Sequence, residues 1–96
     1  MASVRDLKKD IDYLVYEIIS DCFSAMVLSR DEKTSDKLAE IISGAVILRN
    51  DLFARARYRG EERDPAVVRN YYRELRSELR TEVDRLFKRL IEVVKE

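Results

Sequence analysis

The residue types that most often carry out acid–base or nucleophilic chemistry are scarce in this sequence. Its 96 residues include no histidine and a single cysteine, Cys22. Ser-His and Cys-His pairs are therefore excluded, and the most common general base is missing. One thiol without an imidazole cannot form a structural zinc site, and no glycine-rich loop is present to bind nucleotide phosphates. We expect no catalytic, cofactor-binding or metal-binding residues and predict a protein that is not an enzyme.

Arginine is the one chemically distinctive residue type, and it is concentrated between residues 49 and 80. This segment holds nine arginines against six acids, and clustered arginines can neutralise nucleic-acid phosphates. An RNA- or ribosome-associated accessory protein is therefore an alternative hypothesis, although solvated arginine is the more ordinary state. The candidate nucleic-acid contacts, which surround a predicted helix end, are Arg55, Arg57, Arg59 and Arg63.

Composition indicates long amphipathic helices in a single domain comprising residues 1–96. The chain is 46% hydrophobic and 40% charged, with only two glycines and one proline. Nineteen basic and nineteen acidic residues cancel, so the chain has no general attraction to nucleic acid or to anionic membranes. No apolar stretch is long enough to span a bilayer and no signal peptide is recognisable. We expect a cytoplasmic protein with no membrane association.

Apolar residues recur every three or four positions in three segments, which predicts helices at about 4–28, 35–59 and 65–95. We expect Ser3 to cap the first helix, Thr34 or Ser35 to cap the second and Gly60 to end it. Asp64-Pro65 is typical of a helix start. The predicted core residues are Leu7, Ile11, Val15, Ile18, Cys22 and Met26, then Leu38, Ile41, Ile42, Ala45, Leu48, Leu52 and Ala56, then Val68, Tyr72, Leu75, Leu79, Val83, Leu86, Leu90 and Val94.

Short connections favour antiparallel neighbours, so the fold class is all-α, an up-down-up three-helix bundle that dimerisation would complete. Gly44 lies within the second helix. It either lets another helix approach closely or is a tolerated glycine. The lone Cys22 lies in the apolar stripe of the first helix and is expected to be an inert buried thiol.

Charged residues of the third helix form two ridges. Arg69, Arg73, Arg76 and Arg80 form one, and Glu74, Glu78 and Glu82 form the other. Internal pairing with the first helix is the preferred interpretation of the arginine ridge, over phosphate binding or plain solvation. The acids expected to pair with it are Asp6, Asp10, Glu17 and Asp21.

Arg49 lies within the apolar stripe of the second helix, where a guanidinium must reach solvent or find a carboxylate. From their heights in the predicted bundle, Glu17 and Glu78 are the expected partners. We interpret this arginine as a structural residue rather than a functional one.

The first helix has a second apolar face on the side away from its core stripe. Two companion helices cannot cover a helix that is apolar on both sides, and exposed apolar patches usually mark interfaces. We therefore predict a non-enzymatic interaction protein that self-associates, most simply as a homodimer, and that has a possible further protein partner. The candidate interface residues are Tyr13, Tyr16, Phe23 and Val27, joined by Phe87 and Ile91 of the third helix.

Two resemblances to known families involve the first helix. Residues 4–17, VRDLKKDIDYLVYE, resemble the N-termini of small uncharacterised conserved bacterial proteins, which implies a bacterial helical protein and no particular function. Residues 7–14 also resemble the start of the first helix of small all-helical chorismate mutases. The further basic and polar residues of the mutase motif have no matching positions here.

Overall fold

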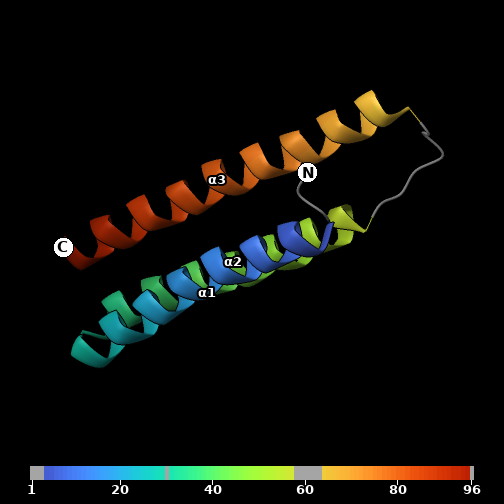
Figure 1. Ribbon diagram of the computed structural model, residues 1–96. Coiled ribbons are helices and arrows are strands. Elements are labelled where there is room, and N and C mark those ends of the chain that lie inside the picture. Colours follow the sequence, from blue (N-terminus) through green and yellow to red (C-terminus); the bar gives the residue numbers. More distant parts are fainter. Residues whose placement is uncertain (1–3, 30, 58–63, 96) are drawn as a thin grey trace.

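A computed structural model describes residues 4–29, 31–57 and 64–95. It contains three helices, α1 (Val4–Leu28), α2 (Glu32–Ala56) and α3 (Pro65–Lys95), and no strand among the described residues. Figure 1 shows α1 and α2 side by side, with the C-terminal ends of α1 and α3 at the same end of the molecule. The predicted all-α three-helix bundle is confirmed.

Cross-helix contacts give the direction of each helix. Arg49 of α2 pairs with Asp12 of α1, and further along α2 the Phe53 ring lies beside Lys8, so these two helices are antiparallel. Arg55 of α2 pairs with Glu78 of α3, and Glu40 of α2 pairs with Arg89 of α3. The helices α2 and α3 are therefore antiparallel as well. The helices therefore run up, down and up, as expected when consecutive helices are joined by short connections.

One hydrophobic core runs along the bundle and is built from the predicted stripes. Leu7, Ile18, Leu38 and Leu52 are almost completely buried, as is Cys22. Within each helix, consecutive buried residues are three, four or seven positions apart, which places them on one side of that helix. Ile42, Leu48 and Met26 pack against this core as half-buried residues.

The helix boundaries differ from the sequence prediction at both ends of α2. The helix begins at Glu32, not near Ser35, because Asp31 is its N-cap: the carboxylate accepts hydrogen bonds from the Lys33 amide at 3.1 Å and the Thr34 hydroxyl at 3.2 Å. Aspartate is among the best N-cap residues. Residues 29–36 lack apolar side chains, so this stretch was expected to be a loop or a frayed turn; the Asp31 cap instead starts the helix one turn before Ser35.

At its other end α2 stops at Ala56, not near residue 59. Two tyrosines of α3 bind its last carbonyls: the Tyr71 hydroxyl donates to the Arg55 carbonyl at 2.8 Å, and the Tyr72 hydroxyl donates to the Ala56 carbonyl at 3.2 Å. These bonds satisfy acceptors that a helix end leaves open. The proposed end at Gly60 and the Ser3 cap lie outside the described residues.

The start of α3 is as predicted. The Asp64 carboxylate accepts a hydrogen bond from the Ala66 amide at 2.9 Å, and Pro65 is the first helical residue. The core stripe of α3 was predicted wrongly at its two ends. Val93 is buried in place of Val94, which is 59% exposed, and Val68 is 36% exposed. Residues 64–70 are all exposed, so the core of α3 begins after Val68.

Candidate interaction surface

The second apolar face of α1 is open to solvent in the single chain. We call the residues Tyr13, Tyr16, Ser20, Phe23 and Val27 the outer α1 face. Its large residues are mostly exposed: Tyr13 by 64%, Tyr16 by 71%, Phe23 by 54% and Val27 by 84%. They lie opposite the core stripe because they step by three and four residues, half a turn away from Ile11, Ile18 and Cys22. Each of these four residues therefore keeps more than half of its surface exposed.

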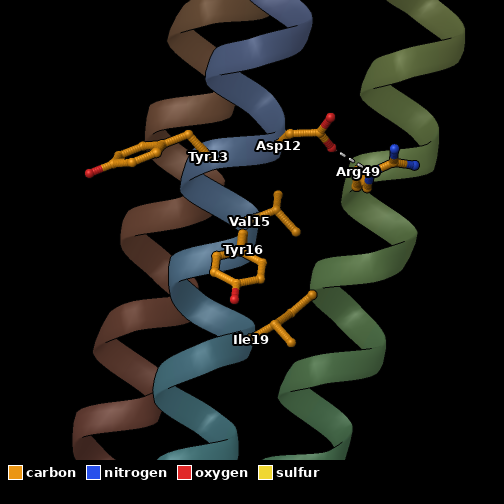
Figure 2. A pocket seen from close by; sticks show the side chains of 6 residues that line it. All are labelled: Asp12, Tyr13, Val15, Tyr16, Ile19 and Arg49. Carbon is orange, nitrogen blue, oxygen red and sulfur yellow. Dashed lines mark hydrogen bonds and ion pairs between the residues drawn. The ribbon is translucent and has the colours of Figure 1, made fainter.

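Two hollows follow one another along this face. The first has a volume of about 400 Å³ and lies toward α2 (Figure 2); it is lined by Asp12, Tyr13, Val15, Tyr16, Ile19 and Arg49. The second, of about 430 Å³, is lined by Tyr16, Ile19, Ser20, Phe23, Ser24 and Val27. Because Tyr16 and Ile19 line both, the two hollows are continuous along the helix. Sequence reasoning missed Ile19 and Ser24, although Ser24 follows Ser20 by one turn.

The two candidate residues of α3 differ in exposure. Ile91 is 51% exposed, whereas Phe87 is half-buried and packs against the core. Both lie in the C-terminal half of α3, toward the end where α1 also finishes, and Leu28 and Val94 are exposed there as well. This end of the molecule therefore carries additional exposed apolar side chains on two helices.

Arg49 borders the first hollow and is held by a partner that the sequence did not indicate. Its Nε lies 2.7 Å from an Asp12 carboxylate oxygen, the contact drawn in Figure 2. Its guanidinium carbon also lies 4.2 Å from the centre of the Phe53 ring, within cation–π range. The predicted partners Glu17 and Glu78 were wrong, because Asp12 is on the flank of α1 that faces α2 and Glu78 is taken by Arg55.

The candidate nucleic-acid residues are only partly placed. Arg55 is bound from two sides, by Glu78 at 2.8 Å and by Asp51 at 2.9 Å. These contacts raise the pKa of the guanidinium, and the hydrogen bond from Arg55 lowers the pKa of Glu78. Arg57 is exposed at the end of α2, while Arg59 and Arg63 lie outside the described residues. An arginine already bound by two carboxylates has little capacity left for a phosphate.

The arginine ridge of α3 pairs with α1 at one position. Arg76 lies 2.9 Å from Asp10, as the parallel arrangement of α1 and α3 predicts. Arg69 donates to the Pro65 carbonyl at 3.4 Å, and Arg80 has no ion pair with any described acid. Arg76 and Arg80 line a smaller hollow of about 210 Å³ with Asp10, Tyr13, Leu14 and Leu79. The expectation that the whole arginine ridge pairs with the acids of α1 is therefore confirmed only at Arg76.

Three further features bear on chemistry. Cys22 is completely buried, and burial followed by the negative charge of Asp21 raises the pKa of its thiol. The part of the chain that the structure describes contains no group of three or more residues able to hold a metal ion. Within the same residues, none of the helices combines the length and apolarity needed to cross a membrane.

Comparisons with known proteins add no family: no family model matches the chain, and no curated protein or solved structure matches it significantly. The resemblance of residues 4–17 to small bacterial proteins therefore remains a prediction from the sequence, as does the resemblance of residues 7–14 to the mutases.

Proposed function

We propose that this protein is a non-enzymatic, cytoplasmic interaction protein that self-associates through the outer α1 face. The observation that carries the proposal is the exposure of Tyr13, Tyr16 and Phe23 on one side of a single helix. An aromatic side chain presents roughly 150–250 Å², so the three rings leave on the order of 400 Å² accessible. Apolar patches of about 300–600 Å² are often functional on single-chain proteins.

The size of this face indicates a weak dimer. A stable protein interface buries about 800 Å² on each partner, roughly twice what the three rings supply. Val27 of the same face and the adjoining Ile19, which lines both hollows, would add to it. We therefore expect a dimer that dissociates on dilution, with a dissociation constant in the micromolar range or weaker.

Light scattering coupled to size-exclusion chromatography tests the proposal. We expect the mass to rise from one chain toward two as the concentration increases from about 10 µM to about 1 mM, which spans the range expected for a weak dimer. Tyr16→Glu should weaken association at least tenfold, because it places a charge in the centre of an apolar contact.

Ile47→Glu is the matched control. Ile47 is 68% exposed, close to the 71% of Tyr16, but it lies on α2. The Ile47→Glu substitution should leave association unchanged. A mass of one chain at every concentration would contradict the proposal. An equal loss of association in Tyr16→Glu and Ile47→Glu would contradict it as well.

Nucleic-acid binding is the alternative function. The double ion pair of Arg55 gives it no support, and the net charge of zero offers no long-range attraction.

A further inference from the structure

The outer α1 face has an internal arrangement that bears on how two copies would meet. Large residues lie on either side of Ser20: Tyr16 is four residues before it and Phe23 three residues after it, and Tyr13 and Val27 lie seven residues away in each direction. Serine is the smallest residue of the face. The surface is hollowed there, since Ser20 and Ser24 line the hollow of about 430 Å³. The face therefore offers a bulky side chain one turn before a depression.

We propose that the occupant of the outer α1 face is a second copy of this chain, packed with its α1 antiparallel and with the two-fold axis beside Ser20; this rests on the proposed self-association. With the chains reversed about Ser20, Tyr16 of one copy lies level with Ser24 of the other, and Tyr13 lies level with Val27. Each Tyr16 ring then enters the hollow of the opposite copy. The contact is made twice, as a two-fold interface requires.

A parallel pair fits the same face poorly. In parallel α1 helices every residue faces its own equivalent, so Tyr16 would meet Tyr16 and each hollow would face the other hollow. Protein interfaces are packed as densely as interiors, and such voids lose contacts.

The charges of α1 also favour the antiparallel arrangement. Arg5 and Lys9 are exposed and continue the stripe of the outer α1 face toward the N-terminus. Parallel helices would bring Lys9 beside Lys9, and like charges across a contact are unfavourable. In the antiparallel pair Lys9 lies near the C-terminal end of the other α1, whose last turn has no basic residue.

Site-directed cross-linking distinguishes the two arrangements. In a Cys22→Ala background, single variants Lys9→Cys, Ser20→Cys and Val27→Cys are treated with a short bismaleimide. A linker is preferable to a direct disulfide, because packed helices are about 8–10 Å apart and a disulfide needs closer Cα atoms. In the antiparallel pair, a rise of 1.5 Å per residue places the two copies of residue 9 about 33 Å apart and the two copies of residue 27 about 21 Å apart.

We expect Ser20→Cys to give a covalent dimer in high yield, and Lys9→Cys and Val27→Cys to give none alone. A mixture of Tyr13→Cys and tagged Val27→Cys chains should link to each other. Circular dichroism confirms that each variant folds, and all four positions are exposed.

Equal self-linking at residues 9, 20 and 27 would establish a parallel pair and overturn this inference while leaving self-association intact. A dimer seen by light scattering without any linking would place the contact on another surface and also overturn it. A single-chain mass throughout would overturn the proposed function itself.

Discussion

Arg49 shows how a charged residue is accommodated in an apolar stripe. Its guanidinium lies over the Phe53 ring while binding Asp12. Side chains at such positions commonly bury their stems and keep the charge at the surface. The Asp12 and Arg49 side chains are 52% and 39% exposed, so this pair contributes less than about 1 kcal/mol to stability.

Gly44 gives a prediction at a single backbone position. A methyl group added there would meet the nearest Leu86 carbon at 3.7 Å, an ordinary van der Waals distance. Close approach of α3 therefore does not require glycine, and the interpretation as a tolerated glycine is supported. Gly44→Ala should raise the free energy of unfolding by about 0.5–1 kcal/mol, because alanine is the better helix former. Urea denaturation measures it; a lower stability would show that Leu86 cannot accommodate the methyl.

Glu78 gives a prediction about pH. The hydrogen bond from Arg55 lowers its pKa in the folded state, so the pair stabilises the fold above the unfolded pKa of about 4.3 and loses this effect as the pH falls through the folded pKa. Glu78→Gln should reduce the free energy of unfolding at neutral pH by up to about 1 kcal/mol, since the carboxylate is 45% exposed.

The difference between wild type and Glu78→Gln should shrink as the pH is lowered below about 4. Urea denaturation at a series of pH values measures it. Glu74→Gln is the control, because Glu74 lies on the same helix and has no ion pair with the described residues. A difference between wild type and Glu78→Gln that stays constant into acid would show that the ion pair is not responsible.

The ends of α2 illustrate how an element can be closed locally or by a neighbour. Its N-terminus is closed by Asp31, three residues after α1 ends at Leu28. Its C-terminus receives hydroxyl groups from Tyr71 and Tyr72, whose rings meet edge to face with centroids 5.4 Å apart. This pair also links the beginning of α3 to the end of α2. The two tyrosines therefore have a structural role at the junction of α2 and α3.

Removing one of these hydroxyls gives a prediction for the element. Tyr71→Phe should lower the free energy of unfolding by about 0.5–1.5 kcal/mol, because the half-buried Arg55 carbonyl loses its 2.8 Å bond. Thermal or urea denaturation measures the change. Tyr16→Phe serves as the control, since the Tyr16 hydroxyl forms no hydrogen bond with the described residues. Equal stability of all three proteins would contradict a capping role for Tyr71.

At the scale of the whole molecule, the bundle is long and thin, with Cα extents of 53 × 19 × 16 Å. Each helix has two neighbours, so each keeps one outward side. The outward sides of the helices differ in character. That of α3 carries exposed polar residues such as Asn70, Ser77 and Lys88, whereas that of α1 carries three aromatic rings. This asymmetry is what makes α1 the candidate interface.

Several properties followed from the sequence alone because they depend on neighbours along the chain. The spacing of Leu7, Ile11, Val15 and Ile18 specifies a helix and the side that it buries. Asp64-Pro65 specifies a helix start from two adjacent residues. Exposure of Tyr13 and Tyr16 was also foreseeable, since two neighbouring helices can cover only part of a third.

Other properties were decided by tertiary structure. Arg49 pairs with Asp12 rather than Glu17 because the register of α1 against α2 is set by core packing, which charge spacing does not reveal. The end of α2 depends on hydroxyl groups that lie sixteen residues away in the chain. The burial of Val93 in place of Val94 depends on how α3 rotates against its neighbours at its far end. Contacts between distant segments fix these features, and no local pattern encodes them.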